Sequence, residues 1–177
     1  MQRNTIDPKE HNVYYSRYLD KLPQDINLLD AYYKDLDSVQ SYFTAIPETK
    51  HTHRYAAGKW SILEVFQHLI DTERIFIYRT FRIARADKTP LANFDQEGYV
   101  PSSGAQRKSM SMLLHEFEAT RTASIALLES LQSDDLARVG ISSNYPMSAR
   151  AAAFVVPGHN IWHMEIIDNK YLGGHDV

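Results

Sequence analysis

The chain has 177 residues, of which 44% are hydrophobic, and this length and composition predict a single globular domain over residues 1–177. Its 19 basic and 22 acidic residues give a formal net charge of −3, which excludes the strongly basic balance that is typical of nucleic-acid-binding domains. The absence of cysteine excludes disulfides, thiolate metal sites and a cysteine nucleophile, so a bound metal must use His, Asp or Glu.

The N-terminal segment shows no targeting signal. It is polar and aromatic, MQRNTIDPKEHNVYYSRYLDK, and lacks the apolar region of a secretory signal. No apolar run in the chain approaches the ~18 residues that a membrane span requires. We therefore expect a cytoplasmic protein that binds neither membranes nor nucleic acid.

Two long helices are predicted in the first half of the chain. Between Pro23 and Pro47, apolar residues recur every three to four positions, which predicts a helix over residues 24–46 with one face in the core. Ser61 precedes Glu64 by three residues, and this spacing is typical of a capping box, in which each side chain bonds the backbone N–H of the other. A second helix is therefore expected from Ser61 to about Ala84.

A long connection and a third helix follow. Residues 87–106 mix Pro, Gly, Asn and Ser, which predicts a loop, and loops of this length in a compact domain often cover a functional site. A broad apolar band predicts the third helix over residues 108–131. The connection at residues 136–146 leaves room for a short β-element.

A fourth helix is expected after Pro146, with Ser148 as its N-cap and with Gly173 and Gly174 ending it in left-handed geometry. Pro157 lies inside this run, where it must either kink one long helix or begin a new one, because its ring removes a backbone donor. Four helices of about 20 residues without an alternating strand pattern predict an all-α protein, an antiparallel four-helix bundle with long connections.

Three histidines are candidates for a metal site. His159 and His163 stand four residues apart, so on a helix their imidazoles share one face and can hold one ion. This spacing alone is equally consistent with two hydrogen-bonded polar residues. His68 is the candidate third ligand, because it lies on a helix face that must turn inward, although a lone inward histidine is ordinarily a core residue. The other five histidines fall in expected loops and termini or stand singly on the third helix.

Three neutral imidazoles suit zinc, nickel, iron or another borderline transition ion and leave a coordination place for water or substrate. Such an ion lowers the pKa of a bound water or thiol and so produces a nucleophile at neutral pH. Glu64, Asp71 and Thr72 are candidates for orienting a ligand or transferring a proton, and Arg79 and Arg82 for neutralising an anionic substrate. Charged residues on a helix are, however, more often solvated or paired for stability than catalytic.

Three segments carry a resemblance to a known family: GKWSILEVFQHLIDTERIFIYRTFRIARAD (58–87), EFEATRTASIALLESL (116–131) and GHNIWHMEIIDNKYL (158–172). They resemble the DinB/YfiT-like superfamily, and the resemblance extends over most of the chain. It implies a four-helix bundle that is commonly dimeric, and it maps the three metal ligands of the family onto His68, His159 and His163. Asn160 stands where relatives often have Glu; a zincin-type protease, which needs Glu there, is not expected.

The resemblance implies a metal-dependent enzyme for a small-molecule substrate. Relatives use zinc or nickel to activate a low-molecular-weight thiol, and others are described as hydrolases. We therefore expect a homodimeric thiol S-transferase-like enzyme or hydrolase, with Glu64, Asp71 and Arg79 as candidate catalytic residues. The alternative is a non-catalytic, stress-related protein, similar to DNA-damage-inducible members, in which the metal site is vestigial or only holds the second and fourth helices together.

Overall fold

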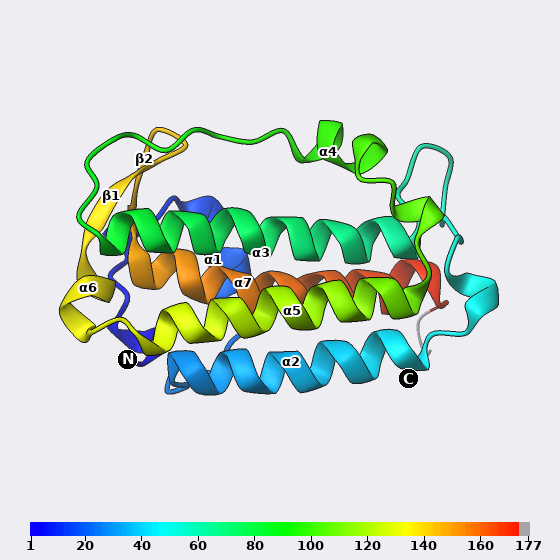
Figure 1. Cartoon of the computed structure of the whole chain (residues 1–177), viewed down its shortest axis with the longest axis horizontal. Helices are drawn as coiled ribbons and strands as arrows, with labels where there is room; N and C mark the ends of the chain where they lie inside the picture. The colour runs from blue at the N-terminus through cyan, green and yellow to red at the C-terminus, as the bar shows by residue number, and fades with distance from the viewer. Residues whose placement is uncertain (174–177) are drawn as a thin grey trace.

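Four long helices form the body of the structure, a computed structural model that describes residues 1–173. They lie side by side (Figure 1): α2 (Leu28–Ala45), α3 (Ile62–Ala84), α5 (Met110–Glu129) and α7 (Ala149–Ile166). Each packs against two of the others, so that the order around the bundle is α2, α5, α3, α7. The predicted all-α four-helix bundle is confirmed. Among residues 1–173, no helix combines the length and apolar character needed to cross a membrane.

The bundle contains both parallel and antiparallel neighbours, so the predicted antiparallel arrangement is wrong for two of the four neighbouring pairs. Lys108 contacts Gln67 near the starts of α5 and α3, and Arg121 contacts Glu73 further along both helices, so α3 and α5 run in the same direction. α2 and α7 are also parallel, whereas α3 with α7 and α2 with α5 are antiparallel (Figure 1). The connection between α3 and α5 permits this, because an extended chain of its length exceeds the ~35 Å of a helix of this size.

Local sequence signals set the helix starts. The capping box of Ser61 and Glu64 is present, and the Ser148 side chain accepts a bond from a backbone N–H in the first turn of α7, as predicted. α2 begins at Leu28 rather than at residue 24. The preceding residues 24–27 are held instead by hydrogen bonds from the N-terminal backbone, which keep them out of the helix.

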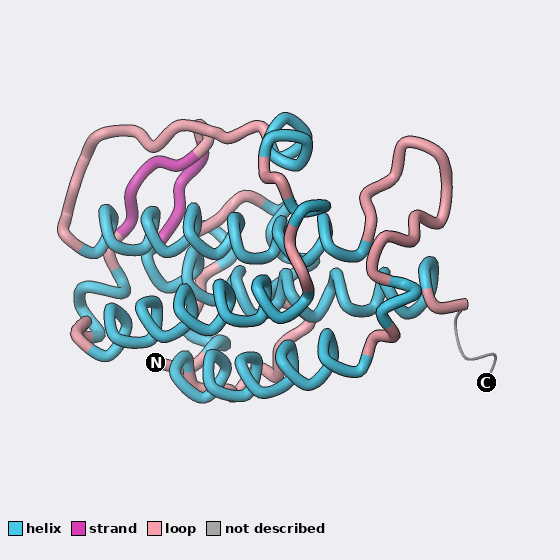
Figure 2. Tube along the Cα trace, turned by 45° about the vertical axis from the view of Figure 1, so that its right-hand side comes forward, coloured by secondary structure: helices cyan, strands magenta, loops and turns pink. Residues whose placement is uncertain are grey.

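The N-terminal segment and the connections between the long helices carry short elements (Figure 2). Residues 87–106 are not a continuous loop, because α4 forms there with its Val100 side chain buried and its backbone packed near α3. The short β-element for which the sequence left room after the third helix is a hairpin, whose turn residues Ser143 and Asn144 both have positive φ, as a type I′ turn requires. The short elements are α1 (Ser16–Leu19), α4 (Gln96–Ser102), α6 (Ser133–Ala137), β1 (Val139–Ser142), β2 (Tyr145–Ser148) and 3₁₀ turns at Arg3–Thr5, Pro8–Glu10, Val13–Tyr15, Glu48–Lys50 and Ala105–Arg107.

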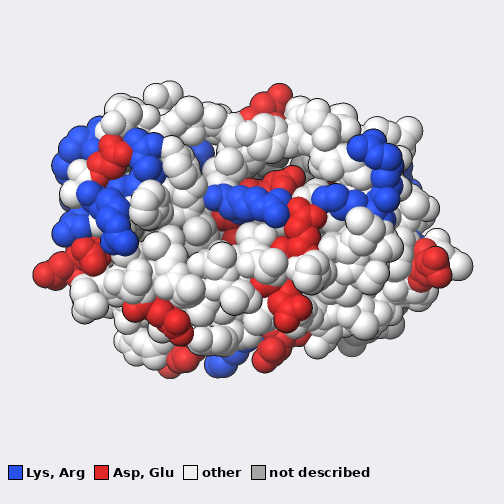
Figure 3. All heavy atoms as spheres, in the orientation of Figure 1, with Lys and Arg blue, Asp and Glu red and all other residues white. Residues whose placement is uncertain are grey.

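The surface over α3 and α5 carries interleaved basic and acidic side chains, and it is hollowed below α4 (Figure 3). The hollow is a cavity of about 600 Å³ between α3 and the α4 region, with Ile75 and Tyr99 among its lining residues. No histidine lines it, so it is separate from the site described below.

α7 continues through Pro157 as one helix. Proline has no N–H, so the carbonyl of Ala153, one turn earlier, loses its helical donor. The buried Tyr32 hydroxyl donates to this carbonyl over 2.9 Å and takes the place of the missing N–H. A π-helical segment, Ile167–Tyr171, extends α7, and Gly173 then adopts φ +89°, the left-handed geometry predicted for it. Gly174, predicted to share this role, lies outside the described residues.

The buried interior has two apolar clusters with a polar layer between them. One cluster contains Phe76 of α3 and Phe154 of α7, and the other contains Phe66 of α3 and Ile167. On each long helix, buried polar residues lie between the two clusters. The layer includes Asp35, Gln67, His68, Thr72, Glu73, Arg121, Ser124, His159, Asn160 and His163. Every candidate metal ligand is part of this layer.

Candidate metal centre

Three imidazoles meet between α3 and α7. His68 projects from α3, and His159 and His163 project from successive turns of α7. The Nε2 atoms of His68 and His159 are 3.2 Å apart, and one ring nitrogen from each of the three residues lies within 4.8 Å of the others. The three side chains belong to residues only 4%, 4% and 8% exposed. The structure thus brings together the three residues singled out as candidate ligands.

The electrostatics of this cluster fit a divalent cation. Burial lowers the pKa of His68 to about 4 and, with the neighbouring His68, that of His163 to about 3. Burial and both neighbours lower the pKa of His159 well below its ordinary value. All three imidazoles are therefore neutral near pH 7 and offer lone pairs. The cluster, as described within residues 1–173, contains no carboxylate, so a divalent ion would keep its full positive charge.

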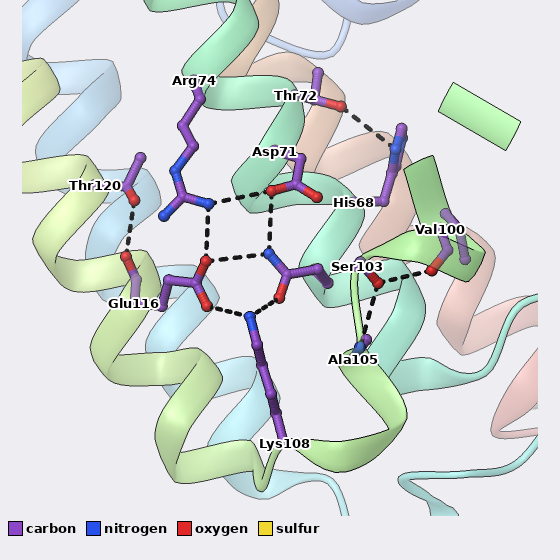
Figure 4. Close-up of polar contacts among 11 residues, drawn as sticks. His68, Asp71, Thr72, Arg74, Val100, Ser103, Ala105, Lys108, Glu116 and Thr120 are labelled. Carbon is purple, nitrogen blue, oxygen red and sulfur yellow. Dashed lines mark hydrogen bonds and ion pairs between the residues drawn. The ribbon is translucent and has the colours of Figure 1, made fainter. Parts of the chain in front are cut away.

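Thr72 provides the polar support of the cluster. Its Oγ1 lies 3.4 Å from Nδ1 of His68, one helical turn earlier on α3 (Figure 4). The other nitrogen of the His68 ring faces His159. A partner on the outer nitrogen fixes both the tautomer and the orientation of a ligating imidazole. Thr72 is placed where it could do this, and its orienting role stays a prediction.

Aromatic side chains enclose the cluster. The Tyr18 ring meets His159 edge to face, with ring centroids 5.0 Å apart, and the Trp162 ring lies 4.8 Å from that of His163. Tyr18 approaches so closely because Gly158 has no side chain: a Cβ at this position would lie 2.1 Å from the Tyr18 carbonyl oxygen. The glycine before the first histidine of α7 is therefore required by the packing of the N-terminal segment.

Two cavities open on different members of the cluster. A cavity of about 850 Å³ reaches His159 and Thr72, and a smaller one of about 240 Å³ reaches His163. Tyr14, Tyr18 and Gln96 line both cavities and so lie between them. The walls of the larger cavity come from the N-terminal segment, from α3, from residues 93–96 and from the β-hairpin. As expected, part of the long connection lies over the site.

Two of the predicted catalytic residues have partners elsewhere. The Glu64 carboxylate accepts from the Ser61 N–H in the capping box and pairs with Arg54 at 2.7 Å. The Asp71 carboxylate points toward Arg74, on the side of α3 that faces α5, whereas His68 lies on the other side (Figure 4). Within the described chain, neither carboxylate has a hydrogen bond to the three histidines. Their catalytic roles stay predictions.

The two arginines considered for anion binding differ sharply. Arg82 already pairs with the Asp87 carboxylate. Arg79 is buried beside the larger cavity, and its Nη2 donates to the Ala92 carbonyl and to Ser143 Oγ over 3.2 Å each. Burial lowers its pKa from the ordinary range. Of these two residues, only Arg79 lacks a carboxylate partner in the described structure.

A buried ion network next to the histidines was not predicted from the sequence. Arg121 contacts Glu73 through two bonds of 2.9 Å and Asp35 over 2.8 Å. Asn160, the residue after His159, donates to Asp35 over 2.7 Å and so attaches the ligand-bearing turn of α7 to this network. Burial raises the pKa of Asp35 to about 6, against the lowering effect of Arg121. The signal that could have indicated this network is that these charged residues occupy inward-facing positions on their helices.

Comparisons with known proteins agree with this fold. The model of the DinB superfamily matches residues 31–167. YfiT from Bacillus subtilis, described as a probable metal-dependent hydrolase with an unusual four-helix bundle topology, is similar in structure with a TM-score of 0.72 and 16% identity. The similarity covers 93% of this chain and 90% of YfiT.

A mycothiol-dependent maleylpyruvate isomerase is also similar in structure, with a TM-score of 0.65 and 10% identity over 85% of this chain and 62% of the isomerase. No curated protein sequence matches the chain. At these identities the two structures establish the fold alone. The family model, however, covers most of the sequence, including all three histidines, and the chain belongs to the DinB superfamily.

Proposed function

We propose that this protein is a metal-dependent enzyme in which His68, His159 and His163 hold one divalent transition ion, zinc or nickel. The observation that carries the proposal is that three neutral, buried imidazoles converge where a cavity of about 850 Å³ ends. Structural zinc sites are usually closed by four protein ligands, whereas catalytic sites use three and keep a place for water or substrate. A site of three histidines beside an open cavity has the second character.

We propose further that the reaction is transfer of a low-molecular-weight thiol to an electrophilic small molecule. Two cavities that reach different histidines of one cluster suit two reactants better than the single substrate of a hydrolase. The mycothiol dependence of the related isomerase is consistent with thiol chemistry, and the description of YfiT keeps hydrolysis as the second candidate. A homodimeric state and a cytoplasmic location stay predictions.

The bound ion would supply Lewis acidity that lowers the pKa of the thiol into the neutral range. The chain provides the surroundings. Thr72 orients the His68 ring, while Tyr18 and Trp162 cover the cluster and limit access of water. Burial raises the pKa of Tyr18 above its ordinary value, so this hydroxyl stays protonated and acts as a hydrogen-bond donor rather than as a base. Tyr14 lies 3.2 Å from the Tyr18 hydroxyl and holds it in place.

The test combines metal binding with turnover. Zinc and nickel are titrated into metal-free protein, and thiol consumption is followed with a chromogenic electrophile, with a chromogenic ester as the hydrolytic arm. We expect one ion per chain and metal-dependent thiol transfer, and we expect His159→Ala to lose both. His115→Ala is the matched control, since this histidine is exposed on α5 and should retain both.

Two results would overturn the proposal. If all three histidine variants still bind the metal, the proposed metal site is wrong. Stoichiometric binding with a large gain in melting temperature, but without turnover on a broad panel of thiols and esters, would instead establish the non-catalytic alternative. Ester hydrolysis without thiol transfer would show that the enzyme is a hydrolase and not a thiol transferase.

A further inference from the structure

Two arginines of the bundle are almost inaccessible to solvent, and they differ in charge compensation. Arg121 is 0% exposed and contacts the carboxylates of Glu73 and Asp35 at 2.8–2.9 Å. Arg79 is 1% exposed, and no carboxylate of residues 1–173 lies within ion-pair distance of it. Its Nη1 has no hydrogen-bond partner among the described residues. The Arg79 site is therefore short of negative charge.

Leaving a buried cation without a counter-ion costs several kcal/mol in protein interiors. Neutral groups offset only part of this cost at Arg79. Two oxygen acceptors, the Ala92 carbonyl and Ser143 Oγ, bind Nη2, and the guanidinium carbon lies 4.9 Å from the ring centroid of Phe76 and 5.7 Å from that of Phe94. The nearby Tyr15 side chain also favours the charged form and raises the pKa of Arg79 against the effect of burial. A site that tolerates this arrangement is suited to an anion supplied by a ligand.

The residues around Arg79 are also walls of the larger cavity. Phe76, Phe94 and Ser143 all contact the guanidinium and all line the 850 Å³ cavity. Ser142, the preceding hairpin residue, lines it too, and its buried hydroxyl has no partner among the described residues. At this end of the cavity, the Ser142 hydroxyl in the wall and Arg79 Nη1 behind the wall are thus two buried polar groups without a hydrogen-bond partner in the described structure.

The same cavity extends to the histidine cluster along one stripe of α3. His68, Thr72, Phe76 and Arg79 follow one another at spacings of four, four and three residues, so they share a helix face. Eleven residues of helix correspond to a rise of ~16 Å between His68 and Arg79, which the backward tilt of the arginine side chain shortens. A ligand that joins the two ends must be elongated.

We propose that Arg79 binds the carboxylate of an elongated small-molecule substrate whose reacting group lies at the histidine cluster. This inference rests on the proposed function and names its substrate class. The carboxylate can belong to the thiol or to the electrophile, since both meet at the cluster. Because Nη1 is enclosed, the segment that carries Ala92 and Phe94 must give way when the carboxylate enters.

The first arm of the test uses metal-free protein, dialysed free of chelator, so that it does not depend on metal chemistry. Calorimetric titration compares hexanoate with hexanamide, which has nearly the same shape without the charge. We expect wild type to bind hexanoate at least tenfold more tightly than hexanamide. Arg79→Met should abolish this preference, and Arg79→Lys should retain part of it, because a lysine keeps the charge but not the planar pair of donors. Arg85→Met, which removes an exposed charge at the end of α3, should behave as wild type.

If Arg79 only stabilised the fold, Arg79→Met would lower the urea midpoint. We expect Arg79→Met to keep the urea midpoint of wild type or to raise it, because the variant removes an uncompensated buried charge. Equal binding of hexanoate and hexanamide to wild type would overturn the proposal, and so would unchanged hexanoate binding in Arg79→Met. If Arg79→Met does not fold, the wild-type preference and its reduction in Arg79→Lys still decide the question.

The second arm uses zinc-loaded protein and identifies the source of the carboxylate. Thiols and electrophiles are each supplied in carboxylate and amide forms. Arg79→Met should raise KM at least tenfold for the reactant whose carboxylate it binds and should leave KM unchanged for the amide form of that reactant. Equal effects on both forms would contradict direct binding. Absence of all turnover in this arm would count against the proposed function, whereas the first arm would still report on the anion site.

Discussion

Tyr32→Phe tests how α7 tolerates a proline two residues before its first candidate ligand, His159. The Tyr32 hydroxyl donates over 2.9 Å to the Ala153 carbonyl, which has no helical donor because Pro157 lacks an N–H. Both Tyr32 and Ala153 are fully buried, so water cannot replace the hydroxyl. Phenylalanine keeps the ring that packs against Arg121 and removes only the donor. A buried carbonyl left unsatisfied costs about 1–3 kcal/mol, which is the expected loss in free energy of unfolding.

A double-mutant cycle with Pro157→Ala isolates the hydrogen bond. Alanine restores an N–H to the helix, and this N–H can bond the Ala153 carbonyl itself. Tyr32→Phe should therefore cost about 1–2 kcal/mol less in the Pro157→Ala background than in wild type. Urea denaturation of metal-free protein measures the four free energies without a contribution from bound ions. Equal costs in the two backgrounds would refute the substitution of the hydroxyl for the missing N–H.

Three further substitutions probe the packing and the ion network. Gly158→Ala places a methyl 2.1 Å from the Tyr18 carbonyl oxygen and should lower the free energy of unfolding by about 1–3 kcal/mol, seen as a lower urea midpoint; an unchanged midpoint would contradict this close approach. Arg121→Met strands the Glu73 and Asp35 carboxylates and should cost about 3–5 kcal/mol in the same assay, and a cost below ~1 kcal/mol would contradict a buried network. Burial raises the pKa of Asp35 to about 6 from its ordinary value of 3.8, so the folded protein keeps a proton that the unfolded chain loses between these pH values. The free energy of unfolding of wild type therefore falls as the pH rises through this interval. The stability of Asp35→Asn relative to wild type should increase over the same interval and stay constant at higher pH. A difference between the two proteins that does not change with pH in urea titrations would refute the assignment.

Features that depend on neighbouring residues could be predicted from the sequence. The capping box of Ser61 and Glu64 joins residues three apart, and the pairing of His159 with His163 follows from the helical period alone. The predicted start of the first long helix was wrong, because the contacts that set the observed start are not local. Residues 24–27 are bonded to the N-terminal backbone, and no helix signal within them reports this.

Features that depend on distant segments could not be predicted. The parallel direction of α3 and α5 follows from the path of a long connection, which hydrophobic periodicity does not encode. The partners of Arg121 come from α2 and α3, and many other acidic residues of the chain were equal candidates. The resemblance to a family was stronger evidence for His68 as the third ligand than its position on the helix, because a single inward histidine is also typical of an ordinary core.

The walls of the larger cavity are mostly independent of the helices that hold the histidines. Tyr14, Asn93 and Ser143 line it from the N-terminal segment, the long connection and the hairpin, none of which belongs to the four long helices. Insertions or exchanges in these surface segments can alter which molecules fit while the bundle packing stays constant. The architecture is in this sense modular. A laboratory search for new substrate ranges can diversify these three segments together and leave the scaffold untouched.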